Sequence, residues 1–143
     1  MQKKIIASLL ALLTAHARAA PEKTFCPLRV PAAAVTMQAP EGWLASSPTD
    51  LLLSGGGIIS GAPAERGVLI PESMKKAKHG NEERYLVSGE KWFFCNYGRT
   101  RLQLVKRMND DAEECTIVYT EGRGQTIKSM YAYCPVPGLI PDR

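Results

Sequence analysis

The stretch KWFFCNYGRTRLQLVK, residues 91–106, holds the clearest structural pattern in the sequence. Its first seven residues are rich in aromatic side chains, and Gly98 ends that run. From residue 100 to residue 106 the character alternates, so that Leu102 and Leu104 share one face while Arg101 and Gln103 share the other. Alternation with a period of two is typical of a half-buried strand, and a glycine between two such runs indicates a turn. The stretch therefore predicts two antiparallel strands.

Two further strands are expected toward the C-terminus. Residues 108–114 are polar and acidic and predict a loop. The β-branched run CTIVY, residues 115–119, predicts a strand. EGRG at 121–124 predicts a turn, and residues 126–134 predict a last strand that Pro135 and Pro137 close. Residues 91–134 are therefore predicted to form an antiparallel meander of four strands.

The first half of the chain gives weaker strand signals and no long helical pattern. Residues 25–35 suit an edge strand, because Pro27 and Pro31 interrupt them. Apolar runs at 51–53 and 58–59 flank three glycines, which predicts either a bulge or a tight turn between two strands. Residues 73–78 have some helical character, and residues 85–87 predict a short strand. We expect an all-β or strongly β-dominated single domain over residues 20–134, followed by a C-terminal extension over residues 135–143.

The first 19 residues have the pattern of a cleaved signal peptide. Lys3 and Lys4 begin it, residues 5–13 are apolar apart from Ser8, and ARA at 17–19 is a small-x-small cleavage site. Its removal leaves 15 basic against 14 acidic residues, so the formal net charge falls from +4 to +1. That balance does not favour nucleic acid as a partner. We expect a periplasmic protein that binds no nucleic acid and inserts into no membrane once the signal is removed.

All four cysteines lie in the predicted mature chain, at Cys26, Cys95, Cys115 and Cys134. An even number in a small exported domain favours two disulfides. A zinc site is disfavoured, because no two of these cysteines are closer than 19 residues. Four cysteines allow three pairings. If the first and last strands pair, Cys26–Cys134 would join the ends and Cys95–Cys115 would link the first and third strands of the meander.

The sequence shows no convincing catalytic or metal-binding set. His79, the one histidine of the mature chain, lies in a charged run at 75–83 where a base would be solvated and poorly held. The carboxylate pairs at 82–83, 110–111 and 113–114 lack the apolar setting that makes a general acid. The run SGGGIISG at 54–61 lacks the Lys-Ser/Thr of a phosphate-binding P-loop. We therefore expect no enzyme and no metal or other cofactor.

Charged segments and tyrosines point instead to a protein partner. The segment 75–79 is basic and the segment 110–114 is acidic, while Tyr119, Tyr131 and Tyr133 offer aromatic contact area. Arginine and tyrosine are frequent anchors of protein interfaces. The predicted partner-binding residues are Lys75, Lys76, Lys78, His79, Arg99, Arg101 and Arg107.

The chain from Cys26 to Cys134 resembles a family of small exported proteins of Gram-negative bacteria. The resemblance rests on FCP at 25–27, PEGW at 40–43, SGAPAE at 60–65, LIP at 69–71, KWFFCNYG at 91–98, CTIVY at 115–119 and YC at 133–134. It implies a periplasmic, β-rich protein with two disulfides. Some members of the family are encoded among type VI secretion genes, which implies an immunity role. The charged segment 75–83 departs from the family pattern.

These observations predict a non-enzymatic periplasmic protein that binds another protein. The most concrete form of the prediction is an immunity protein that neutralises a type VI secreted toxin acting on the cell wall. A loop or strand edge would enter the active cleft of the toxin, and the disulfides would lower the entropy cost of docking. Two alternatives stay open at this point. One is a cell-wall hydrolase using carboxylates such as Glu82, Glu83, Asp110 and Glu113, and the other is an envelope factor similar to a lysozyme inhibitor.

Overall fold

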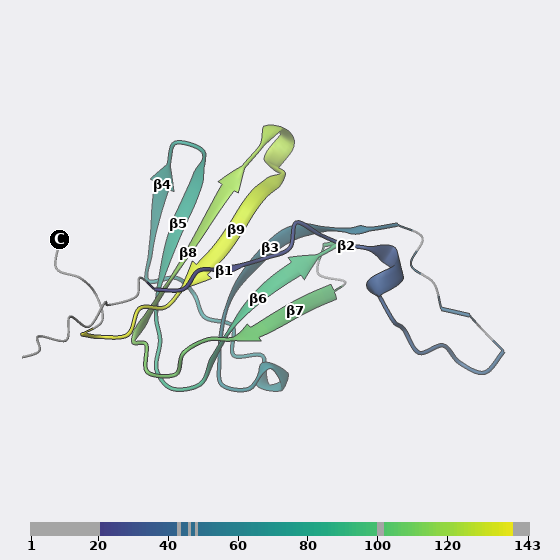
Figure 1. The fold of residues 1–143 in the computed structure, drawn as a ribbon, viewed down its shortest axis with the longest axis horizontal. Coiled ribbons are helices and arrows are strands. Elements are labelled where there is room, and N and C mark those ends of the chain that lie inside the picture. Colours follow the sequence, from purple (N-terminus) through teal and green to yellow (C-terminus); the bar gives the residue numbers. More distant parts are fainter. Residues whose placement is uncertain (1–20, 43, 46, 48, 100–101, 139–143) are drawn as a thin grey trace, which may run out of the picture.

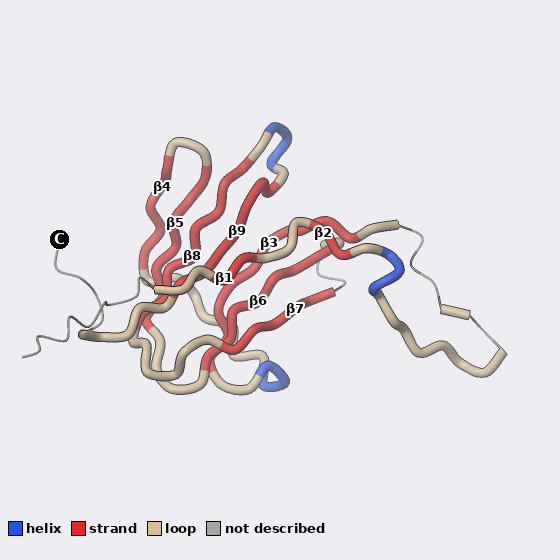
Figure 2. The backbone as a smooth tube through the Cα atoms, in the orientation of Figure 1, coloured by secondary structure: helices blue, strands red, loops and turns tan. Residues whose placement is uncertain are grey.

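The computed structural model describes residues 21–42, 44, 45, 47, 49–99 and 102–138, and in them almost all regular structure is β-strand. The predicted signal segment, residues 1–19, lies outside the described residues. Two antiparallel sheets form the domain, and three short 3-10 turns lie in its loops (Figure 2). The predicted all-β class is confirmed. The strands are β1 (Thr24–Phe25), β2 (Arg29–Val30), β3 (Leu51–Ser60), β4 (Ser73–Ala77), β5 (Gly80–Leu86), β6 (Lys91–Tyr97), β7 (Leu102–Arg107), β8 (Glu114–Glu121) and β9 (Ile127–Tyr133), and the 3-10 turns are η1 (Ala32–Ala34), η2 (Pro63–Glu65) and η3 (Arg123–Gln125).

The two sheets diverge from a shared base. The five-stranded sheet has the order β1-β9-β8-β5-β4, and the four-stranded sheet has the order β2-β3-β6-β7. In Figure 1 the β4–β5 and β8–β9 hairpins point to the top, whereas β6 runs to the right and β7 returns to the left. The buried core lies between the sheets and includes Ile58, Phe93, Tyr97 and Ile117, each no more than 1% exposed.

The four strands predicted for residues 91–134 are all present, but they do not form one continuous meander. β6 pairs with β7, and β8 pairs with β9, so both predicted hairpins are confirmed. β7 and β8, however, belong to different sheets, and β8 pairs with β5 instead. The acidic segment between them is therefore a crossing from one sheet to the other. Alternation along each strand cannot reveal this, because it gives the buried face of a strand and not the identity of its neighbour.

The N-terminal segment follows the edges of both sheets, as its prolines predict. β1 is the edge strand beside β9, and β2 is the edge strand beside β3. The chain passes from one sheet to the other at Pro27, whose carbonyl accepts a 2.8 Å hydrogen bond from the hydroxyl of the buried Tyr97. The expected pairing of the first and last strands is thus confirmed, with Thr24 opposite Ala132.

The disulfides are Cys26–Cys95 and Cys115–Cys134, so the expected pairing Cys26–Cys134 with Cys95–Cys115 is wrong. The register explains the error. Cys26 donates its N–H to Met130, four residues from Cys134 along β9. Four strand residues span roughly 13 Å, whereas bonded cysteines have Cα atoms within about 7 Å. The register of β8 with β9, in which Thr116 lies opposite Tyr133, brings Cys115 beside Cys134, with Cα atoms 4.2 Å apart.

The glycine run forms a bulge inside one long strand. β3 is continuous from Leu51 to Ser60, and its register with β6 shifts between Leu53 and Gly55. The predicted bulge is confirmed, and the alternative of a tight turn between two strands is not. A Cβ on Gly56 would overlap the backbone carbonyl oxygen of Phe94, so the close approach of the two strands requires glycine there.

The segment 73–78 is a strand and a turn, not a helix. β4 pairs with β5 from Ser73 to Ala77, and the chain reverses at Lys78 and His79. Gly80 begins β5 and runs so close to the carbonyl oxygen of Tyr119 that a Cβ there would overlap it. Pairing with a neighbouring strand therefore overrides the weak local preference for a helix.

Candidate partner-binding surfaces

The structure places the predicted partner-binding residues in three separate parts of the molecule. The β4–β5 turn, the β6–β7 turn and the end of β7 lie apart in Figure 1, so they form no single basic ridge. Arg101 lies outside the described residues. Arg99 lies in the β6–β7 turn with a positive φ of 55°. The remaining residues divide between the hairpin, with Lys75, Lys76, Lys78 and His79, and the end of β7, with Arg107.

The hairpin β4–β5 forms the outer edge of the five-stranded sheet. All five residues of β4 are exposed, and β4 is the last strand in the sheet order. Lys75 lies opposite Glu82, and Lys76 lies opposite Asn81. Within the described part of the chain, no ion pair reaches Lys75, Lys76 or Lys78. The hairpin therefore presents lysine charges that nothing in the described fold neutralises by direct contact.

This hairpin is held firmly at its base and its turn. The His79 carbonyl accepts a 2.8 Å hydrogen bond from the N–H of Glu121, at the far end of β8. The Asn81 side-chain amide donates to the Tyr119 hydroxyl at 2.7 Å. A seven-residue ladder joins β5 to β8. The lysines therefore belong to a strand and a turn that hydrogen bonds to β8 hold in place, and not to the solvated loop that the sequence predicted.

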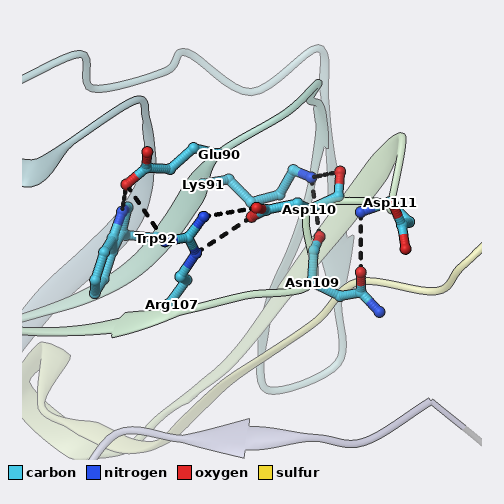
Figure 3. Close-up of polar contacts among 7 residues, drawn as sticks. All are labelled: Glu90, Lys91, Trp92, Arg107, Asn109, Asp110 and Asp111. Atoms are coloured by element: carbon cyan, nitrogen blue, oxygen red, sulfur yellow. Dashed lines mark hydrogen bonds and ion pairs between the residues drawn. The ribbon is translucent and has the colours of Figure 1, made fainter.

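Arg107 lies at the end of β7 in a closed polar cluster (Figure 3). Its guanidinium contacts Asp110 at 2.6 Å and reaches Glu90 at 4.0 Å. It also lies over the ring of Trp92, 5.8 Å from its centre, and Trp92 donates its indole N–H to Glu90 at 2.8 Å. The hydrogen bond from Arg107 holds the pKa of the Asp110 carboxyl below its usual value and raises the pKa of the guanidinium. Arg107 thus has partners within its own chain.

Lys91, which the sequence analysis did not single out, is fully buried beneath this cluster. Its ammonium donates 2.9 Å hydrogen bonds to the backbone carbonyls of Asn109 and Asp110 (Figure 3). Burial lowers its pKa, against the opposing pull of Asp110 and Asp111. The signal was present in the sequence, because alternation along β6 puts residue 91 on the same face as buried Phe93 and Cys95. Lys91 fixes the crossing between the two sheets.

The acidic segment 108–114 is correspondingly ordered. Besides the contacts of Asp110, the Asn109 side chain accepts a 2.9 Å hydrogen bond from the N–H of Asp111. Glu114 forms a 2.5 Å ion pair with Arg84, whose pKa it raises. Two of its carboxylates are therefore used in local contacts, which differs from the solvated loop of free charges that we expected.

The family model described as the type VI secretion system Tli immunity protein matches residues 47–134. This match covers more than half of the chain and every strand from β3 to β9. The chain belongs to the Tli immunity protein family. A search of curated proteins and a search of solved structures each found no match.

The Tli match bears out the resemblance drawn from the sequence. It spans both the β4–β5 hairpin and the Arg107 cluster, and three of the four cysteines. Cys26 lies before the matched segment, although it is bonded to Cys95 inside it. The region shared with the Tli family therefore carries both candidate surfaces, and the preceding segment completes the two sheets along their edges.

An aromatic group lies on the outer face of the five-stranded sheet of this Tli protein. Phe25 and Tyr131 have ring centres 5.0 Å apart, and Tyr133 stacks 6.4 Å beyond Tyr131. The Lys23 ammonium lies 4.7 Å above the Tyr131 ring. Tyr119 is not part of this group, because its partner Met130 is buried on the opposite face. Two of the three predicted tyrosines are thus brought together.

His79 and Glu83 are two of the side chains considered for catalysis. His79 lies in a turn, and no group of metal-ligating side chains was found among these residues. A cleft of about 420 Å³ lies where β3 diverges from β8 and β9, and Glu83 lines it. The buried Tyr85 hydroxyl donates to Glu83 at 2.6 Å, and burial followed by this contact raises the Tyr85 pKa. None of the helical turns seen in this part of the chain has the length or apolarity of a membrane-spanning helix.

Proposed function

We propose that this protein is a periplasmic immunity protein that neutralises a type VI secreted toxin by binding it, without catalysis of its own. The observation that carries the proposal is the match to the Tli immunity family over residues 47–134. An immunity protein acts on the toxin, so the function requires a stable binding surface and no reactive group. The exposed, preorganised β4–β5 hairpin supplies such a surface.

Export to the periplasm is supported by the cysteines and by the N-terminal sequence. Two disulfides join all four cysteines, and such bonds persist in oxidising compartments. Residues 1–19 have the composition of a signal peptide. The protein would then meet its toxin in the compartment where a neighbouring cell delivers it. Fractionation of cells should find the mature chain, beginning near Ala20, in the periplasm.

Direct occlusion is the mechanism that fits this fold. A seven-residue ladder joins the hairpin to β8, and two disulfides cross-link the chain. A preorganised surface loses little conformational entropy on binding. The hairpin would cover the active cleft of the toxin, so that substrate cannot enter.

The proposal is tested by protection and by binding together. Cells that receive the cognate type VI toxin in their periplasm should survive only when this protein is exported with it. The purified pair should form a stoichiometric complex and the toxin should lose its activity. Survival without complex formation would argue for an enzymatic or indirect mechanism, and death despite export would remove the immunity role.

The finer part of the proposal is that the toxin acts on the cell wall. Purified peptidoglycan incubated with the toxin should then release soluble fragments, and addition of this protein should stop the release. The immunity protein alone should release none, which also tests the hydrolase alternative. A toxin that instead releases fatty acids from phospholipid vesicles would refute the cell-wall target and leave the immunity role intact.

A further inference from the structure

The outer edge of β4 is the longest strand edge of the five-stranded sheet that no described segment covers. β4 has five residues, Ser73 to Ala77, all exposed, and among the described strands it pairs with β5 alone. At about 3.4 Å per residue, this edge is roughly 17 Å long. The other edge strand of the sheet, β1, has only two residues. An open edge of this length is a template on which another extended chain can pair.

The ladder on the other side of the hairpin determines which backbone groups face this edge. His79 accepts from Glu121, and Val87 donates to Glu113, so the odd-numbered residues of β5 exchange hydrogen bonds with β8. Antiparallel ladders alternate, so the even-numbered residues of β5 bond to β4 through Ser73, Lys75 and Ala77. The N–H and C=O groups of Met74 and Lys76 therefore point away from the sheet.

The charge of this edge indicates what can pair with it. Lys75 and Lys76 lie on opposite faces of β4, since successive side chains alternate. Lys78 follows in the turn, and among the described residues none of these lysines has an ion pair. Met74 is 58% exposed and adds apolar area on the face of Lys76. An incoming strand would therefore carry acidic residues on both faces.

We infer that the toxin binds through an extended acidic segment that adds to the edge of β4 as a sixth strand. This inference rests on the proposed function and specifies the part of the toxin that is recognised. The main-chain bonds of Met74 and Lys76 supply register and affinity, and the lysines select acidic side chains. The hairpin is preorganised by its bonds to β8, so docking needs no rearrangement of this chain.

Proline at residue 74 tests the main-chain part of this inference. Met74→Pro removes an N–H that faces the open edge, and proline is tolerated at such positions. The matched control is Met74→Ala, which removes the same side chain and keeps the N–H. We expect Met74→Pro to weaken affinity for the inactivated toxin about tenfold more than Met74→Ala. Equal affinities for the two folded variants would overturn the inference.

Charge reversal tests the acidic character of the partner. The double variant Lys75→Glu, Lys76→Glu should weaken toxin affinity more than tenfold, and wild-type affinity should fall as salt is raised. The control reverses two exposed lysines on other strands, Lys106→Glu and Lys128→Glu, which should change affinity less than threefold. Self-association of the β4 variant with unchanged toxin affinity would show that the lysines only protect the edge, and would refute the inference.

These experiments separate the inference from the function on which it rests. If the wild-type protein binds no toxin, the proposed function fails and the strand pairing fails with it. If the wild-type protein binds the toxin, and Met74→Pro and the double variant Lys75→Glu, Lys76→Glu bind it as tightly as wild type does, the immunity role stands and the toxin uses another surface. Circular dichroism and denaturation midpoints of each variant establish that the folded proteins are being compared.

Discussion

The two basic regions of the molecule, the β4–β5 hairpin and the corner around Lys91 and Arg107, differ in what their charges contact. In the corner, the Lys91 ammonium is buried on two backbone carbonyls, and Arg107 is paired with Asp110. In the hairpin, the described lysines have no ion-pair partner and stand on an exposed edge strand. Cations that look alike in the sequence thus hold the fold together in one region and face outward in the other.

Substitutions in the two basic regions should therefore affect different properties of the protein. Changes in the corner should act first on the free energy of unfolding, because they release the segment that crosses between the sheets. Changes in the hairpin lysines should act on toxin affinity and leave stability almost unaltered.

Replacement of Lys91 by methionine should cause the largest loss of stability. Lys91→Met keeps the buried stem but leaves the carbonyls of Asn109 and Asp110 without their donor. Such unsatisfied groups cost about 1–3 kcal/mol each, so we expect a loss of roughly 2–6 kcal/mol in urea denaturation. Toxin affinity of the folded variant should stay within threefold of wild type. A loss below about 0.5 kcal/mol would contradict the structural role of Lys91.

Gly80→Ala tests how closely the β4–β5 hairpin packs against β8. The added Cβ would overlap the Tyr119 carbonyl oxygen, so the hairpin must shift away from its neighbour. Overpacking of this kind costs about 1–3 kcal/mol. Gly89→Ala is an informative control, because a Cβ there meets no atom within 4 Å, although its positive φ adds strain. If Gly80→Ala proved no more destabilising than Gly89→Ala, the close contact with β8 would be refuted.

The Arg107–Asp110 pair should contribute less, with a defined dependence on pH. Because the Asp110 pKa is lowered in the folded state, its stabilisation is complete above the ordinary carboxyl pKa and disappears as pH falls through the lowered value. The difference in unfolding free energy between wild type and Asp110→Asn should therefore be smaller at pH 2 than at pH 7. It should also remain below the change caused by Lys91→Met. A difference independent of pH would contradict the ion pair.

Neutralising the hairpin lysines should have the smallest effect on stability. Lys75→Gln with Lys76→Gln removes two exposed charges that have no described ion-pair partner. Exposed substitutions of this kind usually change the unfolding free energy by no more than about 0.5 kcal/mol. Thermal and urea denaturation of this variant should match wild type. A loss greater than about 1 kcal/mol would mean that the lysines hold the fold, as the corner cations do.

The sequence alone was enough to predict those strands in which the pattern of apolar residues reflects burial of one face. Residues 91–97 and 115–119 are apolar enough to be recognised without knowledge of their neighbours, and the Pro27 break marks the edge segment. Residues 73–77 gave no such pattern, because β4 has a single neighbour and no buried side chain. β4 is a strand because its backbone pairs with that of β5.

The candidate surfaces needed information that no local pattern contains. The disulfide pairing depends on the β1–β9 register, which separates Cys26 from Cys134 by four strand residues. The roles of Arg107 and Lys75 depend on what their charged groups contact. The guanidinium of Arg107 is paired with Asp110, whereas the ammonium of Lys75, opposite Glu82 in the register, has no ion pair among the described residues. The sequence shows where the basic residues are, but it does not show which of them have an ion-pair partner in the fold.

Hydrogen exchange of this protein with and without the inactivated toxin tests the central claim most directly. Binding through the β4 edge should slow exchange of the Met74 and Lys76 amides strongly, while Asn109 to Glu113 in the corner should exchange at unchanged rates. Protection confined to the corner, with none at Met74 and Lys76, would contradict the division of roles between the two basic regions.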